Sequence, residues 1–456
     1  MLKRLRVPHT LVLIFAMVVL AWLATFVIPQ GAYERTTTAD GREMVEPGTY
    51  RPLAPRHLSP LVVFTAIPKA FAQSQDIIFF VLIIGGAISV VRATGAVDAA
   101  IGLTLTKLSG RRTVLIGAGM ALFAIGSNTL GMAEEYLPFV PVLLALCAGL
   151  RMDAISAVGI MVVGYGVGYG VAAINPFTVI VAQQIAGLPP TSGLGFRLAI
   201  TLPFLAIGFH HVWRHSQQVA IDPTRGVPPP AAAQAAAAAH PAPTIAHAVI
   251  LSLVFGAIAL LVWGISTRHW YLEEMGAVFL GLTIATAAVG RLSPDRTAQA
   301  FASGATELTM TALLIGVARS IKLVLEEGQI IDSIVHGAAM PLTSLGAYAS
   351  ASGMVLIQSA INLFIPSGSG QAFVTMPIMT PIADLTGVTR QTAVLAFQFG
   401  DGFSNMIMPT NPVLVGILGI AGIPYARWLR FILPLLGKFL LASIIAVCLA
   451  VAIGYR

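Results

Sequence analysis

Long, unbroken apolar runs constrain this chain more than any other feature. Residues 113–150 contain two acidic side chains and no basic one, and residues 10–29 carry no charge. A transmembrane helix needs about 20 apolar residues. Only 10% of all residues are charged, against roughly 25% in soluble domains. Because the runs are continuous rather than alternating, they exclude membrane β-barrel strands, and the sequence predicts an all-α polytopic membrane protein.

The basic residues indicate how the chain is oriented. A net charge of +7 is typical of nucleic-acid binding when it forms a patch. Here the segments assigned to the cytoplasm carry 14 basic and four acidic residues, which is the positive-inside pattern of membrane proteins. We therefore expect a multi-pass protein of the inner (plasma) membrane, with its N-terminus cytoplasmic, its C-terminus outside, and no nucleic-acid partner.

Hydropathy predicts about nine transmembrane helices plus two re-entrant hairpins, at residues 113–150 and 345–385. Each hairpin has a polar tip and two ends on the same side. The spans at 154–188 and 391–423 are broken at Asn175-Pro and Asn411-Pro. We divide the chain into a first repeat with an interface helix (1–213), a cytoplasmic Pro/Ala linker (214–244), and an extra helix with a second repeat (245–456).

The two halves repeat one pattern in opposite orientation. The tip serine lies 48 residues before Asn-Pro in the first half and 44 in the second. Ile185-Ala-Gly-Leu-Pro189 then corresponds to Ile420-Ala-Gly-Ile-Pro424. Inverted repeats with interrupted helices are typical of secondary transporters that bind substrate near the midplane. Broken helix ends expose N–H groups that attract anions and carbonyls that bind cations.

Five motifs lie at or near the tips and breaks: Gly131-Met-Ala-Glu-Glu135, Asn175-Pro-Phe-Thr-Val179, Ile365-Pro-Ser-Gly-Ser-Gly-Gln371, Thr375-Met-Pro-Ile378 and Phe399-Gly-Asp-Gly-Phe-Ser-Asn405. Together they resemble the YfcC / C4-dicarboxylate anaerobic carrier family of the ion transporter superfamily, over nearly the whole chain. The resemblance implies an elevator mechanism, in which a transport domain slides against a scaffold, often within a homodimer. Carboxylate carriers of the superfamily often have Ser-Asn-Thr at both tips; here the second tip reads Ser-Gly-Ser-Gly.

Polar side chains at the tips, at the breaks and inside the last broken span are the candidate binding residues. Intramembrane polar groups are costly, which favours a function. Each also has a structural alternative, such as a self-satisfied turn, a helix cap or a buried hydrogen bond. The candidates for substrate or ion binding are Ser127, Asn128, Thr129, Glu134, Glu135, Asn175, Ser367, Ser369, Gln371, Asp401, Asn405, Thr410 and Asn411.

Four charged residues at or near these candidates have separate interpretations. One carboxylate of the Glu134–Glu135 pair is explained by its favourable interaction with the positive N-terminal end of the helix dipole. Adjacent residues point to different helix faces, so we expect at least one to bind a proton, a coupling cation or a substrate ammonium. Arg319 and Lys322 are expected to extend outward to the membrane surface.

The sequence thus predicts a secondary active transporter of a small carboxylate-bearing metabolite. That substrate is a C4-dicarboxylate or a related organic acid, moved with a cation or by exchange. The alternative is an amino-acid transporter or antiporter, with basic amino acids as one option; a channel and an intramembrane hydrolase are more remote alternatives. The nine histidines lie in loops, the linker or interfaces and no H-E-x-x-H occurs, so we expect no enzyme.

The expected partners follow from this function. They are a small carboxylate or amino acid, the lipid bilayer and a second copy of the chain. We expect no cofactor and no metal centre, with Na⁺ at the hairpin tips or H⁺ as the candidate coupling ions.

Overall fold

The computed structural model describes residues 10–37, 43–46, 48–99, 111–129, 131–175, 177–238, 244–268, 270 and 272–456. Several sequence expectations therefore lie outside the described residues, among them the basic N-terminal segment, Pro176 and the side chain of Glu135. Helices make up nearly all of the regular structure. Four short antiparallel strands modify the all-α expectation: β1 (Gly31–Ala32) pairs with β4 (Arg51–Pro52), and β2 (Arg35–Thr37) with β3 (Glu43–Val45).

Five helical segments among the described residues are long and apolar enough to cross a membrane. They are α3 (Gln75–Ala93), α9 (Leu194–Ile221), α12 (Leu272–Val289), the segment Pro294–Glu327, and α20 (Tyr425–Ala452). The fourth comprises α13 (Pro294–Glu307) and α14 (Thr309–Glu327). Among the other expected spans, α1 (Thr10–Ala24) and α11 (Ile245–Arg268) contain shorter apolar stretches. A helix that is apolar all round must be buried in protein or in lipid. Because these segments also carry large apolar side chains that the protein leaves exposed, the chain is a membrane protein.

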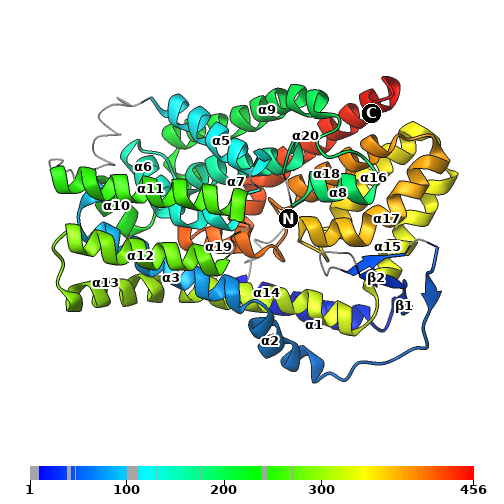
Figure 1. Ribbon diagram of the computed structural model, residues 1–456, viewed down its shortest axis with the longest axis horizontal. Coiled ribbons are helices and arrows are strands. Elements are labelled where there is room, and N and C mark those ends of the chain that lie inside the picture. Colours follow the sequence, from blue (N-terminus) through cyan, green and yellow to red (C-terminus); the bar gives the residue numbers. More distant parts are fainter. Residues whose placement is uncertain are drawn as a thin grey trace.

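The helices pack in two groups (Figure 1). The first, here called the α14 group, contains α1, α2 (Val62–Gln73), α3, α11, α12, α13 and α14. The second, the α18 group, contains eleven further elements, given in chain order: α5 (Arg112–Thr129), η1 (Glu134–Phe139), α6 (Val140–Gly149), α7 (Ala154–Gly170), α8 (Val179–Ile185), α9, α16 (Ala347–Ile361), α17 (Gly368–Thr386), α18 (Arg390–Ser404), α19 (Pro412–Ala421) and α20. The two groups meet where α14 packs against α19 and where α3 packs against η1.

Short elements connect these helices. Between α9 and α11 the chain forms η2 (Pro223–Arg225) and α10 (Ala231–Ala238), and α10 packs against α6. Between α14 and α16 it forms α15 (Ile331–Ala339) and η3 (Met340–Ser344). The linker expected at 214–244 therefore begins inside α9 and includes a short helix, because its alanine tract has the highest intrinsic helix propensity.

The centre of the α18 group is the crossing of α7 and α18. Every residue from 391 to 404 on α18 is buried. A Cβ added to Gly402 would lie 2.3 Å from the backbone nitrogen of Gly170, so the two helices touch through their glycines. Around this crossing α8 packs against α17, and α19 packs against α6. Helix α8 follows the break at Asn175-Pro and contacts α17, which follows the tip of the second hairpin. Likewise, α19 follows the break at Asn411-Pro and contacts α6, which follows the tip of the first hairpin.

Candidate functional site

The first tip and the first helix interruption form one hydrogen-bonded unit. The first tip comprises residues 127–129 and 131–134, at the end of α5 and the start of η1, and the first break is residues 171–178, between α7 and α8. Asn128 Oδ1 accepts from the backbone N–H of Ala173 at 3.1 Å, and Asn175 Nδ2 donates to the Ser127 carbonyl at 2.9 Å. Asn175 Oδ1 also accepts from the N–H of Phe177 at 2.9 Å. These amides satisfy backbone groups that the interrupted helices leave open.

The second tip is residues 366–371, and the second break, residues 405–411, lies between α18 and α19 and is bonded to the turn that precedes the tip. Thr410 Oγ1 donates to the Leu363 carbonyl at 3.0 Å. Asn411 Oδ1 accepts from the Val413 N–H at 2.9 Å and caps α19, whose first residue is Pro412. Both positions match the strong preferences for Asn as a cap and for Pro in the first turn.

A cavity of about 920 Å³ lies between the two helix groups. Its α18-group wall consists of both tips, both breaks and two tyrosines of α7. Its other wall consists of the α2–α3 junction, the start of α12 and one face of α14. Polar and charged side chains come from both walls: Gln73, Ser74, Asp76, Glu134, Tyr165, Tyr169, Thr178, Trp270, Arg319, Lys322, Ser367, Ser369, Asn405, Thr410 and Asn411.

The structure places the predicted residues in two sets. Those that line the cavity are Glu134, Ser367, Ser369, Asn405, Thr410 and Asn411. Those outside its lining are Ser127, Asn128, Thr129, Asn175, Gln371 and Asp401. Their roles in binding stay predictions.

The second set makes contacts within the protein. Ser127 Oγ donates to the Met132 carbonyl at 2.8 Å, and Thr129 Oγ1 donates to the Ile125 carbonyl of its own helix at 2.7 Å. Gln371 Nε2 donates to Gln358 Oε1 at 2.7 Å. Of Glu135 only the backbone, within η1, is described.

Asp401 is a fully buried carboxylate behind the cavity wall. Its Oδ1 lies 3.5 Å from Asn405 Nδ2, and its Oδ2 has no hydrogen-bond partner in the described part of the chain. A Cβ built on Gly368 would lie 3.2 Å from that oxygen and 2.4 Å from Thr178 Cγ2. Asp401, the second tip and the first break therefore converge, and glycine at 368 permits the close approach.

The side-chain amide of Gln398 also reaches Thr178, and its oxygen has no hydrogen-bond donor among the described residues. Gln398 Nε2 donates to Thr178 Oγ1 at 2.8 Å. Buried polar atoms are usually paired. Unpartnered oxygens beside a buried carboxylate are suited to a cation or a proton.

Several residues of the cavity wall were missed from sequence. Arg319 and Lys322 were expected to extend to the membrane surface, but both line the cavity. Two basic residues three positions apart share a helix face, and the contacts of α14 with α19 turn that face toward the breaks. Tyr165, only 2% exposed, has a hydroxyl without a partner among the described residues. An apolar run gives no sign of which tyrosine faces a cavity.

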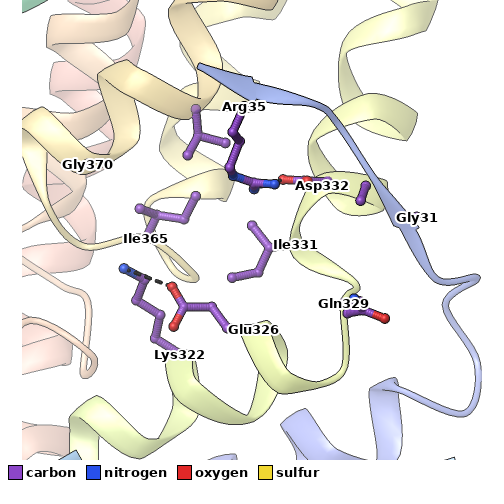
Figure 2. Close-up of a pocket in the computed structure, with 11 residues that line it drawn as sticks. Gly31, Arg35, Lys322, Glu326, Gln329, Ile331, Asp332, Ile365 and Gly370 are labelled. Atoms are coloured by element: carbon purple, nitrogen blue, oxygen red, sulfur yellow. Dashed lines mark hydrogen bonds and ion pairs between the residues drawn. The ribbon is translucent and has the colours of Figure 1, made fainter. Parts of the chain in front are cut away.

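A smaller cavity of about 340 Å³ adjoins the second tip on the side of the β-strands. Figure 2 shows Arg35 directed at Asp332, with 2.8 Å between Nη2 and Oδ1, and Lys322 directed at Glu326, with 3.2 Å between Nζ and Oε1. Lys322 lines both cavities. The ion pair of Lys322 therefore lies where the two spaces approach each other.

Comparisons with known proteins cover almost the full chain. A family model described as C4-dicarboxylate anaerobic carrier matches residues 7–452. The "Putative basic amino acid antiporter YfcC" of Escherichia coli (strain K12) is 30% identical over 497 residues, covering 100% of this chain and 98% of the relative. An "Uncharacterized protein" of Haemophilus influenzae is 27% identical over 501 residues, covering 99% and 98%.

Two solved transporter structures are similar along their length. The YdaH transporter of Alcanivorax borkumensis has a TM-score of 0.45 and 16% identity, covering 98% of this chain and 99% of that one. MtrF of Neisseria gonorrhoeae, described as illuminating a class of antimetabolite efflux pumps, has a TM-score of 0.43 and 20% identity, covering 97% and 95%.

Proposed function

Because the chain belongs to the C4-dicarboxylate anaerobic carrier family, we propose that it is a secondary active transporter of a small carboxylate-bearing metabolite, acting in the inner membrane. The observation that carries this proposal is the convergence of two tips and two helix breaks on one cavity. Such a site at interrupted helices is how secondary transporters bind polar solutes within the bilayer.

A carboxylate fits the α18-group side of this cavity. The N-terminal ends of α17 and α19 lie at its wall, through Ser367 and Gly368 and through Asn411 and Pro412. Helix N-termini present N–H groups and a positive dipole end to anions. Ser369 adds a hydroxyl from the first turn of α17. A C4-dicarboxylate and an amino acid both contain the carboxylate that this wall would bind.

The transport mechanism proposed here is movement of the α18 group against the α14 group. The cavity lies between the groups, and the reciprocal packing of α8 on α17 and of α19 on α6 supports two repeats of opposite orientation. Movement of one repeat-built body against another is a common form of alternating access. As the α18 group moves along α14, the cavity would open to one side of the membrane or to the other, and the substrate would be released there.

Coupling is proposed to occur at Asp401. Its unpartnered Oδ2 faces the second tip near Gly368, which borders the cavity. A proton or Na⁺ bound there would neutralise a buried charge and fix the tip against the first break. Occupancy by the coupling ion would thus favour the arrangement in which the second tip packs against the first break. Binding of the ion would in this way be linked to binding of the substrate.

Ligand-dependent thermal stabilisation of the purified protein tests the substrate class. A panel of organic acids and amino acids is screened with and without Na⁺ and at two pH values. Binding to the folded state raises the unfolding temperature by mass action. We expect at least one carboxylate-bearing compound to stabilise the wild type but not Ser369→Ala/Asn411→Ala, with Na⁺ or acid increasing the effect. Stabilisation by none of the carboxylates would contradict the proposal.

A further inference from the structure

The guanidinium of Arg197 is buried inside the α18 group without a counter-ion. Arg197 lies in the first turn of α9 and is fully buried. Its Nη1 donates to the carbonyl of Ala172, in the first break, at 3.1 Å. Its Nε and Nη2 have no hydrogen-bond partner, and no carboxylate in the described ranges forms an ion pair with it. Because arginine near the end of a span usually keeps its charge in water, these two buried donors need an explanation.

The start of α9 adds positive potential at the same end of the helix. Its cap residue is Gly193, which has a φ of +73° and no side chain to accept from the first N–H groups. Residues at this position usually supply such an acceptor. The positive end of the helix dipole attracts anions and disfavours a cation such as Arg197 in the first turn. Since helical side chains point back toward the N-terminus, the guanidinium and the uncapped helix end both favour an anion here.

Tyr455 lies at this end of α9 but does not neutralise the charge. Its hydroxyl donates to the Gly193 carbonyl at 2.8 Å and lies beside the Arg197 guanidinium. A Cβ on Gly193 would collide with this hydroxyl and with the side-chain amide of Gln391, so glycine leaves room for both. Burial raises the pKa of the Tyr455 hydroxyl, which therefore stays an uncharged phenol at neutral pH. An arginine remains charged at that pH, and the charge of Arg197 is left uncompensated by the residues around it.

The position of Arg197 favours a small ion over a metabolite. Arg197 lines neither the cavity of about 920 Å³ nor that of about 340 Å³. Its full burial leaves an organic acid no described route to the guanidinium. Ser192 and Gly193, which precede the helix, are only half-buried, so the site lies close to the protein surface. A single halide ion can accept from several N–H groups at once and needs little space.

We propose that Arg197 and the first turn of α9 together bind one chloride ion. The ion would accept from Nε and Nη2 and neutralise the buried charge. Because Nη1 of the same guanidinium donates to the Ala172 carbonyl, the bound ion would also fix the first break against α9. Chloride is here a structural ligand and not the transported solute, so the inference does not depend on the proposed function.

Exchange of the buffer anion tests this proposal on the full-length purified protein. The unfolding temperature is measured as NaCl replaces sodium isethionate at constant ionic strength, and NaBr provides a second halide. Isethionate is too large for a buried site of this kind, so it supplies the salt without the ligand. Because binding to the folded state stabilises it by mass action, we expect chloride and bromide to raise the unfolding temperature saturably by about 2–4 °C.

Variants assign the effect to Arg197. Arg197→Gln removes the charge and should abolish the halide response, whereas Arg197→Lys keeps the charge without the planar fork and should retain part of it. Arg214→Gln is the matched control, because Arg214 is exposed on the same helix; its response should equal that of the wild type. Crystals of the wild type grown in NaBr should also show anomalous scattering from bromide beside Arg197, which requires no variant to fold.

Three results would overturn the inference. Equal unfolding temperatures of the wild type in chloride and in isethionate would mean that water, not an anion, satisfies Arg197. A halide response that Arg197→Gln retains in full would place the ion elsewhere, and bromide absent from Arg197 in the crystals would exclude the site directly. None of these measurements uses a transported solute, so each can fail without contradicting the proposed function.

Discussion

The side-chain amide of Asn175 donates to the main-chain oxygen of Ser127 across 2.9 Å, although the two residues are 48 positions apart. Its oxygen accepts from two N–H groups of the first break, those of Phe177 and Thr178. The single buried side chain of Asn175 therefore connects the first tip to the first break by hydrogen bonds. The two segments that face the cavity are fixed relative to each other by this amide.

Asn175→Ala should destabilise the protein markedly. It removes three hydrogen bonds at a fully buried position, and each is worth about 1 kcal/mol. We expect the free energy of unfolding to fall by about 2–3 kcal/mol, measured by SDS-driven unfolding of the purified protein. Thr129→Ala is the control, because Thr129 bonds only within its own helix; a similar loss in both variants would refute this role of Asn175.

Gly402→Ala should disrupt the crossing of α7 and α18. The new Cβ would lie 2.3 Å from Gly170 N and 2.4 Å from Gly170 Cα, and backbone atoms at a helix crossing cannot rotate away. Overpacking typically costs about 1–3 kcal/mol, which should appear as a lower unfolding temperature. Gly437→Ala on α20 is the matched control, because no side chain and no other helix in the described part of the chain comes within 4 Å of its Cβ position. Equal stability of the two variants would show that the crossing is looser than described.

Asp401→Asn should separate substrate binding from coupling. The buried Oδ2 is unpartnered among the described residues, and asparagine keeps the shape without the charge. We expect the variant to exchange substrate across proteoliposome membranes but to lose accumulation driven by a Na⁺ or pH gradient. Asp384→Asn, where the carboxylate is exposed and pairs with Arg390 at 2.7 Å, should behave as the wild type. Gradient-driven accumulation by Asp401→Asn would exclude Asp401 as the coupling site.

Asp153 gives the fold a predictable response to acid. Its Oδ1 accepts from the Ser156 N–H at 3.0 Å, and its Oδ2 accepts from the Val227 N–H at 3.1 Å and lies 3.3 Å from His215 Nε2. Burial by itself raises the pKa of Asp153, but the hydrogen bonds from His215, Ser156 and Val227 outweigh it and hold the pKa below its usual range. A lowered pKa stabilises the folded state above the unfolded value, and the gain is lost as the pH falls through the folded value.

Asp153→Asn should therefore be less stable at pH 7 by about 1–2 kcal/mol, since asparagine still caps α7 but carries no charge. The difference from wild type should shrink below about pH 4, the ordinary pKa of aspartate. Unfolding of both proteins from about pH 2 to pH 7.5 checks this, since the gain is lost only below about pH 4. A difference that stays constant over that range would mean that the charge contributes nothing.

Much of the fold follows from local patterns in the sequence. Asn411 before Pro412 predicts a new helix after a break, and α19 begins there. The expected hairpin at 345–385 corresponds to α16 and α17, and Ser367 at its tip caps α17. These outcomes depend on capping and proline geometry within a few residues, which a sequence displays directly.

The composition of the cavity wall could not be predicted in the same way. Asn128 and Asn175 look like ligands in sequence, but their amides are occupied by backbone groups of the neighbouring segment. Arg319 looks like a surface cation, yet the contacts of α14 direct it into the cavity. Which face of an apolar helix points inward is decided by contacts between distant segments, and helical periodicity gives little guidance when the whole helix is apolar.

Counterflow in proteoliposomes tests the central claim most directly. Vesicles containing the wild-type protein are loaded with millimolar L-lysine or succinate, diluted into buffer with a trace of the labelled compound, and followed over time beside empty vesicles. A carrier that alternates between two faces should accumulate the label transiently above equilibrium, and only with its own substrate inside. Label that never exceeds equilibrium, or that enters at the same rate whatever the vesicles contain, would contradict transport through the cavity between the two helix groups.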